Sequence, residues 1–392
     1  MKRAITILVF CVAALMSLGL VMLYSSGMWK AGAHYFLMQS IWCVAGIILC
    51  VAAATMDYAQ LKKVAIPLLI FSVILLVLVL IPHVGIKAKG ARRWLGYGPV
   101  RFQCSELAKL AVIIGIALYC ERYQRHLATF KRGILIPALL LLPILGLIFV
   151  GKDRGATILL GAVSGTMLIV AGVRWRYLLP PIVIGVAALV LSIAADPVRY
   201  KRIVSWLNPE ETKLGDGWQA YQATIALGAG GWTGLGLGNG RQKFGFVPEH
   251  HNDFILSMVG EELGLIATTL VVIAFIVIIL CGLYISLRAP DTFGLLLGCG
   301  ITFLIGFQAF INIGVVTGTL PNKGLPLPFI SYGGSNLLIM LANVGLLLSI
   351  ARRARPEEVA QDLPVRDQFG EPNPFRKSSR KGRSEIAGAS PA

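Results

Sequence analysis

The stretch FVPEHHNDFI, residues 246–255, places several ionisable side chains immediately before a long apolar run. Asp253 is the last polar residue before that run, so its carboxylate is expected to be partly desolvated. A carboxylate in this setting is a candidate general base. His250 and His251 could ligate a metal, but adjacent histidines have poor ligand spacing on a helix. The stretch therefore favours proton-transfer chemistry over metal binding.

Two pairs of charged residues lie inside other apolar sequence. Glu106 and Lys109, in SELAK, are three positions apart and share one helix face. They could form a structural ion pair or contact a substrate. Glu261 and Glu262 follow Asp253 by two turns, where ionisable residues are candidates for function. They could equally satisfy buried backbone groups or pair with loop cations.

The segment 83–103 is strongly basic and carries no acid. Its cations predict an anion site, most simply for a phosphate or pyrophosphate, or else contacts with lipid head groups: Lys87, Lys89, Arg92, Arg93 and Arg101. The glycine cluster 228–240, GAGGWTGLGLGNG, matches neither nucleotide-binding glycine motif. Tight turns and close backbone packing are a better interpretation of it than a phosphate cradle.

These groups must be positioned by a membrane scaffold. Of the 392 residues, 56% are hydrophobic and only 14% are charged, which indicates an all-α integral membrane protein with many spans. About 20 apolar residues cross the hydrocarbon layer as a helix. We predict about ten such helices, the first retained rather than cleaved as a signal peptide: 4–24, 35–55, 64–82, 105–121, 133–150, 155–173, 177–194, 254–286, 292–315 and 336–351. Asp153 and Arg154 are expected to cap the sixth.

The even number of spans and the lysines and arginines of the short loops place both termini in the cytoplasm. A membrane domain, 1–353, then has a large outer loop, 195–253, between the seventh and eighth helices. The polar tail, 354–392, is predicted to be disordered. Because the net charge of +17 is spread mainly over the short loops, it predicts no nucleic-acid partner. The seven scattered cysteines support neither disulfides nor a zinc site.

The predicted chemistry combines a carboxylate base with cations outside the membrane. The sequence contains no Walker motif, Ser-His-Asp pattern or haem motif. A reaction there needs a substrate that brings its own energy. A sugar linked to a lipid through pyrophosphate fits, because its leaving group is the anion that the cations would bind.

Three segments together resemble the FtsW/RodA (SEDS) family, in the same order and spacing. They are GARRWLGYGPVRFQCSELAKLAVI, the long motif from NPEETKLGDGW to FVPEHHNDFILSMVGEELGL, and GLPLPFISYGGSNLLIMLANVGLLLSI. GLGNGRQK and SYGGSNLL are closer to the FtsW and sporulation branch than to the RodA branch. The resemblance implies a peptidoglycan glycosyltransferase in the bacterial plasma membrane, which polymerises lipid II at the outer face in cell division and releases undecaprenyl pyrophosphate.

The resemblance also implies site residues and partners. Asp253 falls on the catalytic position, and Arg93 and Lys109 would contact the pyrophosphate. The cavity would be shaped by Glu106, Gln222, Glu249 and His250. A divalent cation, Mg²⁺ or Mn²⁺, is a possible cofactor. Implied partners are a class B penicillin-binding protein (a transpeptidase), other divisome proteins and membrane lipids. Met38, Cys104 and Asn252 depart from the family pattern.

Two other functions fit the same features. A lipid II flippase would use the same cations and a polar path through the membrane, although we find no inverted repeat and no coupling-ion signature beyond Glu261 and Glu262. A non-catalytic scaffold of the division complex would use the tail and outer loops as docking surfaces. Roles in division, elongation and sporulation stay open.

Overall fold

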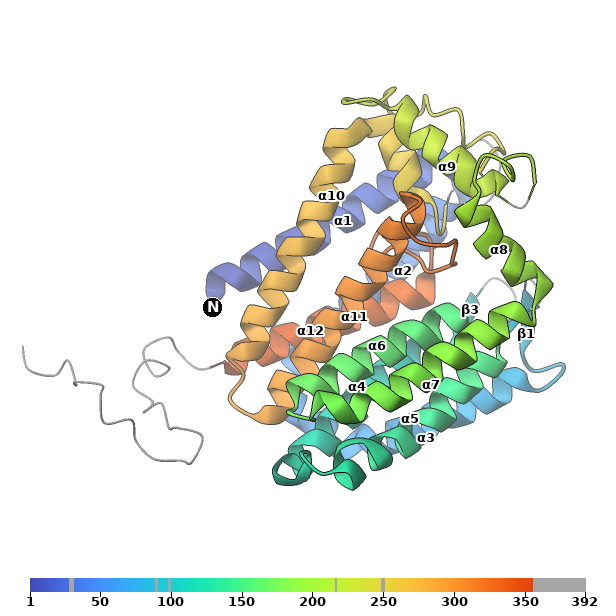
Figure 1. Ribbon diagram of the computed structural model, residues 1–392. Helices are drawn as coiled ribbons and strands as arrows, with labels where there is room; N and C mark the ends of the chain where they lie inside the picture. Colours follow the sequence, from blue (N-terminus) through green and yellow to red (C-terminus); the bar gives the residue numbers. More distant parts are fainter. Residues whose placement is uncertain (28–31, 89–90, 98–99, 216, 248–250, 355–392) are drawn as a thin grey trace, which may run out of the picture. The chain divides into compact units, whose positions relative to one another are not determined.

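The computed structural model describes residues 1–392 except 28–31, 89–90, 98–99, 216, 248–250 and 355–392 (Figure 1). The chain divides into two units, Met1–Ala354 and Arg355–Ala392. The second unit lies outside the described residues, and with it all of the predicted disordered tail except Ala354.

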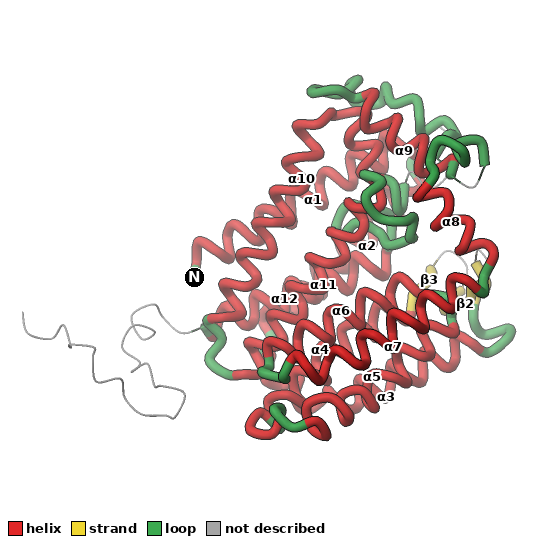
Figure 2. Tube along the Cα trace, viewed as in Figure 1, coloured by secondary structure: helices red, strands yellow, loops and turns green. Residues whose placement is uncertain are grey.

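Each of the ten predicted apolar runs forms a helix (Figure 2). The helices are α1 (Lys2–Gly27), α2 (His34–Thr55), α3 (Leu61–Leu80), α4 (Cys104–Arg122), α5 (Ile136–Val150), α6 (Arg154–Val170), α7 (Trp175–Ala194), α10 (Ile255–Leu287), α11 (Thr292–Val316) and α12 (Gly334–Arg353). Short helical turns precede α3 and α5 and follow α4: η1 (Tyr58–Gln60), the π-helical η3 (Lys131–Leu135) and η2 (Gln124–His126).

Among the described helices, eight are long and apolar enough to cross a membrane. The two that fail are α4, which carries charged side chains at both ends, and α6, which is only 17 residues long. Both pack against α11 in the interior. The prediction of an all-α membrane fold is confirmed, and the shortfall from ten reflects the polar content of α4 and the length of α6.

The interior of the membrane domain is built around α11 and α12. In their apolar windows 72% and 83% of residues are buried, against 6% in α7. α12 packs along α2, while α11 contacts α4, α6 and α10. Figure 1 shows α10 lying alongside α1. Helices α4, α11 and α12 therefore hold their polar side chains inside protein rather than against lipid, as membrane helices with polar groups require.

The basic segment 83–103 contains a small antiparallel sheet that the sequence analysis did not predict. Its strands are β1 (Ile86–Ala88), β2 (Ala91–Tyr97) and β3 (Val100–Gln103), in the order β1-β2-β3. Strand β2 pairs Trp94 with Gln103 and Leu95 with Phe102. Because β3 runs directly into α4, the sheet fixes where α4 begins. The strands are short, and arginines interrupt any polar–apolar alternation in β2.

The segment 195–253, predicted to be a large outer loop, also contains helices, α8 (Pro197–Leu207) and α9 (Trp218–Ala229). The Asp196 carboxylate caps α8 by accepting a hydrogen bond from the Val198 amide, and Pro197 occupies the first turn, where its missing N–H costs nothing. α9 packs against α10 and α11. The loop is therefore partly docked on the helices that follow it.

α10 is broken at Gly264, and the glycine cluster packs into the break. Gly264 has φ +77°, and a Cβ there would lie 2.4 Å from the carbonyl oxygen of Trp232. The amides of Leu265 and Ile266 instead donate to the carbonyls of Gly231 (2.9 Å) and Trp232 (3.2 Å). This arrangement confirms that the cluster serves close backbone packing.

Candidate functional site

Asp253 lies two residues before the start of α10, and its backbone is hydrogen-bonded by residues of α11 and of the loop between α11 and α12. Three successive carbonyls are each hydrogen-bonded. The amide of Tyr332 donates to the carbonyl of His251 (2.9 Å), and the hydroxyl of Ser331 donates to that of Asn252 (2.7 Å). The side-chain amide of Asn312 donates to the carbonyl of Asp253 (2.8 Å). The segment between α11 and α12 therefore fixes the position of the candidate base.

Two side-chain amides on α11 anchor the segment that faces Asp253. Asn312 Nδ2 also donates to the carbonyl of Leu325 (2.7 Å), and Gln308 Nε2 donates to that of Pro326 (2.9 Å). Both amides are fully buried. The two residues are four positions apart, so they share one face of the helix. That face of α11 is hydrogen-bonded to the two residues that follow Gly324.

Gly324 gives the Asp253 carboxylate its space. A Cβ on Gly324 would lie 2.8 Å from Asp253 Oδ2, which is shorter than a normal van der Waals contact between carbon and oxygen. The carboxylate therefore lies directly against the backbone of the loop between α11 and α12. A side chain at position 324 would displace it.

Gln39 on α2 forms two further hydrogen bonds with the loop between α11 and α12. Its Nε2 donates to the carbonyl of Ser331 (3.1 Å), and its Oε1 accepts from the amide of Gly333 (3.2 Å). Nearby, the rings of Tyr35 and His251 stack with centroids 4.5 Å apart, and Tyr332 packs against Tyr35. Burial raises the pKa of the Tyr332 hydroxyl. Side chains from α2, α11 and the loop before α12 thus converge on residues 251–253.

Glu106 and Lys109 form an ion pair in the interior, as one of the two interpretations of their spacing predicted. Lys109 Nζ lies 2.8 Å from Glu106 Oε2, and the two side chains are 0% and 4% exposed. Asn336 Nδ2 donates to the same carboxylate oxygen (2.9 Å). Lys109 also donates to Gln308 Oε1 (3.1 Å). Because Gln308 holds Pro326, this pair is joined to the segment that holds Asp253.

Arg93 joins the small sheet to the start of α6. Its Nη1 lies 3.7 Å from Asp153 Oδ1, and its Nη2 donates to the carbonyl of Lys152. Asp153 caps α6 at the amide of Ala156, which confirms the predicted cap, and accepts from the side-chain amide of Gln103 (2.9 Å). The Arg93 side chain stays 31% exposed. Its guanidinium is therefore anchored yet accessible.

Of the three remaining predicted site residues, the structure describes only Gln222. Gln222 is buried on α9, which packs against α10 and α11. Glu249 and His250 lie outside the described residues. In the described part of the chain, no three His, Cys, Asp or Glu side chains converge as metal ligands. The divalent cation stays a prediction.

Glu261 and Glu262 are hydrogen-bonded to the segment 238–243 and to Ser25 of α1. Glu261 accepts hydrogen bonds from the amides of Arg241 (2.7 Å) and Gln242 (3.2 Å). Glu262 forms a buried ion pair with Lys243, Nζ to Oε1 2.8 Å, and accepts from the Ser25 hydroxyl. The interpretation that these acids pair with loop cations and buried backbone is confirmed.

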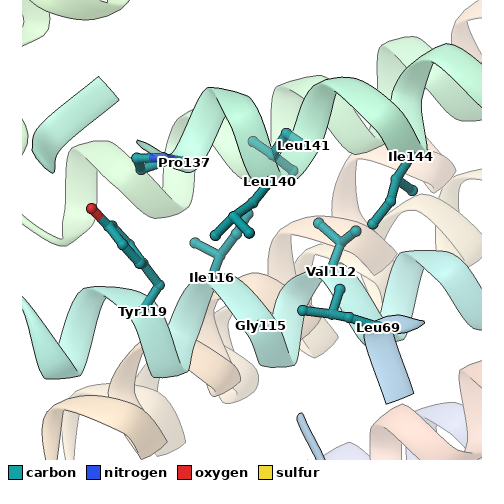
Figure 3. Close-up of a pocket in the computed structure, with 9 residues that line it drawn as sticks. All are labelled: Leu69, Val112, Gly115, Ile116, Tyr119, Pro137, Leu140, Leu141 and Ile144. Atoms are coloured by element: carbon teal, nitrogen blue, oxygen red, sulfur yellow. The ribbon is translucent and has the colours of Figure 1, made fainter. Parts of the chain in front are cut away.

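Two hollows lie near the outer surface of the helices. The first is apolar and lies among α3, α4 and α5 (Figure 3), lined by Leu69, Val112, Gly115, Ile116, Tyr119, Pro137, Leu140, Leu141 and Ile144. It has no charged lining residue, and the hydroxyl of its one tyrosine, Tyr119, donates a hydrogen bond to the carbonyl of Arg132. The second includes Arg92, Arg93, Ser105 and Asp153. Only the second contains cations.

Sequence reasoning missed the residues that hold Asp253. Gln308 and Asn312 lie in an apolar span, where polar amides four positions apart are themselves a signal.

The chain matches the family model FTSW_RODA_SPOVE, described as cell cycle protein, over residues 4–356. It is 40% identical over 360 residues to the probable peptidoglycan glycosyltransferase FtsW of Geobacter metallireducens, covering 90% of this chain and 96% of that protein. It is 39% identical over 356 residues to stage V sporulation protein E of Bacillus subtilis, covering 89% and 97%.

Solved structures give the same result. A structure from work on a peptidoglycan synthase complex that coordinates polymerization and crosslinking has a TM-score of 0.74 at 32% identity, covering 88% of this chain and 96% of that one. The rod shape determining protein RodA of Thermus thermophilus has a TM-score of 0.67 at 29% identity, covering 89% and 97%. The chain therefore belongs to the FtsW/RodA/SpoVE family of cell cycle proteins.

Proposed function

We propose that this protein is a peptidoglycan glycosyltransferase that polymerises lipid II at the outer face of the bacterial plasma membrane in cell division. The observation that carries the proposal is that the backbone and the carboxylate of Asp253 are fixed in position by residues of α11 and of the loop between α11 and α12. Its carbonyl accepts from Asn312, and its carboxylate lies against Gly324. A fixed carboxylate at the mouth of a membrane helix suits a general base. The curated relatives named as glycosyltransferases support this chemistry.

The proposed reaction transfers the donor sugar to the acceptor. The 4-hydroxyl of the acceptor sugar attacks the anomeric carbon of the donor. Asp253 takes the hydroxyl proton as the new C–O bond forms. The bond from the anomeric carbon to the pyrophosphate oxygen breaks with its electron pair, and undecaprenyl pyrophosphate leaves. Because the donor carries its own leaving group, the step needs no ATP.

The predicted substrate contacts remain part of the proposal. The accessible part of Arg93 would contact the pyrophosphate. Lys109 has three N–H donors, of which Glu106 and Gln308 use two, so one is left for a substrate oxygen. Gln222, Glu249 and His250 would line the cavity. A Mg²⁺ or Mn²⁺ ion would neutralise the leaving pyrophosphate if one is bound.

The proposal includes orientation and partners. The lysine and arginine bias of the short loops supports cytoplasmic termini and an outer loop at 195–253. Cysteines engineered into 205–245 should then react with a membrane-impermeant reagent from outside, and labelling from the cytoplasm alone would overturn this orientation. The synthase-complex neighbour supports a class B penicillin-binding protein as partner. Other divisome proteins are expected to dock as well.

A flippase is less well supported, because the candidate coupling acids Glu261 and Glu262 are already bonded to the loop 238–243. The test is a glycan assay. Purified protein, alone and with a cognate class B penicillin-binding protein, is given labelled lipid II, and the products are separated by size. Glycan strands from the wild type support the proposal. Lipid movement across vesicles without polymer would support the flippase, and neither activity would support a scaffold.

A further inference from the structure

Helix α8 carries an apolar stripe that the protein leaves uncovered. Four apolar side chains follow the spacing i, i+3, i+4 and i+7 and so share one face of the helix: Tyr200, Ile203, Val204 and Leu207. The two ends of this stripe are open, since Tyr200 is 58% exposed and Leu207 is 63% exposed. The one buried residue of α8 is Ser205, which is not part of the stripe. The described part of the chain therefore does not cover this apolar face.

The near end of α8 lies where a lipid-exposed span ends. α7 ends at Ala194, and α8 begins at Pro197. Only 6% of the apolar window of α7 is buried within the protein, and Leu191 in its last turn is 69% exposed. Figure 1 shows α8 turning away from α7 toward α9. The stripe therefore starts at the boundary of the hydrocarbon layer, where aromatic side chains such as that of Tyr200 are favoured.

The far end of α8 is fixed to the protein. Trp206 Nε1 donates a hydrogen bond to the carbonyl of Gly318 (2.8 Å), two residues after the end of α11. At the near end, the Asp196 carboxylate caps the helix at the amide of Val198 (3.2 Å). α8 is therefore held at both ends, between the end of α7 and the end of α11.

A cluster of charged groups lies at the start of α8. Arg154, the first residue of α6, donates through Nη1 to the carbonyl of Ser192 in the last turn of α7 (2.9 Å). Its guanidinium carbon lies 5.1 Å from the centre of the Phe149 ring in α5. Arg154 also interacts electrostatically with Arg199 and Asp196. The ends of α5 and α7 and the starts of α6 and α8 thus meet around this guanidinium.

Positive charge exceeds negative charge in this cluster. Arg199 Nη1 lies 2.8 Å from Asp196 Oδ2. Arg202 follows Arg199 by three positions, so the two are neighbours on the surface of the helix. The next acid in the chain, Asp153, pairs instead with Arg93. The charge of the Asp196 carboxylate is therefore set against that of three arginines.

One donor of Arg154 has no partner. Its Nε is buried and forms no hydrogen bond within the described residues. A sheltered guanidinium with an unused donor is stabilised by an anion, and phosphate oxygens match its geometry. The cluster therefore fits a phosphodiester, beside a stripe that fits hydrocarbon.

We propose that α8 and Arg154 form a binding site for an anionic phospholipid of the surrounding bilayer. The stripe of α8 lies against the acyl chains, and Arg154, Arg199 and Arg202 bind the head group, in the manner of amphipathic helices that lie at a membrane surface. Under the proposed orientation this lipid belongs to the outer leaflet. The inference goes beyond the proposed function, because its ligand is a lipid of the bilayer and not the substrate.

The test measures lipid binding to the purified full chain by native mass spectrometry. The protein is titrated with phosphatidylglycerol, or with phosphatidylcholine of the same acyl chains. The wild type should bind phosphatidylglycerol more tightly, because the positive charge of choline opposes the arginines. A cation near an anionic lipid surface contributes about fivefold to binding. Arg154→Gln and Arg202→Gln should each weaken phosphatidylglycerol binding by about that factor and change phosphatidylcholine binding less.

Two further variants separate the head group from the acyl chains. Leu207→Gln should weaken the binding of both lipids alike, because it removes apolar contact and no charge. Lys213→Gln is the matched control, since Lys213 follows α8 in the same segment but pairs with Glu210. It should leave both affinities unchanged. Arg202 is exposed, so Arg202→Gln decides the question if Arg154→Gln does not fold.

Equal affinity of the wild type for the two lipids would overturn the proposal, as would unchanged phosphatidylglycerol binding in the folded arginine variants. Displacement of phosphatidylglycerol by an equal concentration of lipid II would assign the site to the substrate instead. Displacement by a cognate class B penicillin-binding protein would make this face a protein interface, and either result would also overturn the lipid site. No measurement here depends on glycan synthesis, so failure of the proposed function leaves the lipid site to be decided by binding.

Discussion

The side-chain amide of Asn312 reaches across from α11 and donates a hydrogen bond to the backbone carbonyl of Asp253, with 2.8 Å between the two atoms. The same nitrogen donates to the carbonyl of Leu325 (2.7 Å). One buried amide therefore sets the distance between the candidate base and the loop segment that faces it. Asn312 is a positioning residue, since it acts on the reaction only through Asp253 and this loop.

Asn312→Leu should lower kcat by more than it raises KM. Leucine has a similar size but no donor, so two buried carbonyls lose their partner, at about 1–3 kcal/mol each in stability. The base should remain present but poorly placed. Steady-state kinetics with lipid II and thermal unfolding of the purified protein measure the two effects.

Asn343→Leu is the control for this substitution. Asn343 is equally buried on α12, and neither atom of its side-chain amide has a hydrogen-bond partner among the described residues. Removing it should be neutral or stabilising. If Asn312→Leu lowers activity no more than Asn343→Leu does, the positioning role is refuted.

The positions of the helices could be predicted from the sequence, whereas the hydrogen bonds that position Asp253 could not. Run length and apolarity locate a membrane helix, and the spacing of Glu106 and Lys109 puts them on one face. The bond from Asn312 to Asp253 joins residues 59 apart in the chain, and Gln39 reaches Ser331 across 292. Contacts of that kind depend on how helices pack. Local patterns carry no information on that packing.

Lys109→Met should destabilise the protein strongly and Glu106→Gln should relieve much of the loss. Removing the ammonium leaves the Glu106 carboxylate buried without its counter-charge, which costs about 3–5 kcal/mol. The double substitution removes both charges. Thermal unfolding of the two single variants and the double variant completes the cycle.

The double variant also tests whether Lys109 contacts the substrate. A folded Lys109→Met/Glu106→Gln protein should polymerise lipid II poorly, because the donor left for the pyrophosphate is gone. Turnover at the wild-type rate would restrict Lys109 to a structural role. Additive effects of the two single changes on stability would count against a coupled pair.

Asp291, at the start of α11, should make stability depend on acid pH. Burial alone would raise the pKa of its carboxyl, but the Tyr58 hydroxyl and the Lys62 ammonium donate to it and hold the pKa below its ordinary value. The unfolded chain therefore takes up the proton first as the pH falls below about 4, the unperturbed value. The stabilisation is present above that pH and is lost as the pH falls through the lower folded value.

Asp291→Asn should accordingly lower stability at neutral pH and flatten its decline in acid. Thermal unfolding of wild type and variant in the same detergent, across the acid range, provides the comparison. Glu210→Gln is a suitable control, because Glu210 pairs with Lys213 on an exposed surface. An acid decline of the same steepness in Asp291→Asn and the wild type would show that this carboxylate does not cause it.

Asp253→Asn should abolish most glycan synthesis while leaving the fold intact. Asn312 bonds to the backbone carbonyl of Asp253, so the substitution keeps that bond, and the amide keeps the size of the side chain. It cannot take up a proton, and general bases typically contribute about 10²–10⁴-fold to a rate.

Gly324→Ala should reduce the rate by less, since its Cβ only displaces the carboxylate. In the Asp253→Asn background, Gly324→Ala should cost little more, because the group it displaces has already lost its function. Rates of lipid II polymerisation, with thermal unfolding to establish that each variant is folded, measure these effects. A folded Asp253→Asn protein that polymerises lipid II at near the wild-type rate would falsify the assignment of Asp253 as the base.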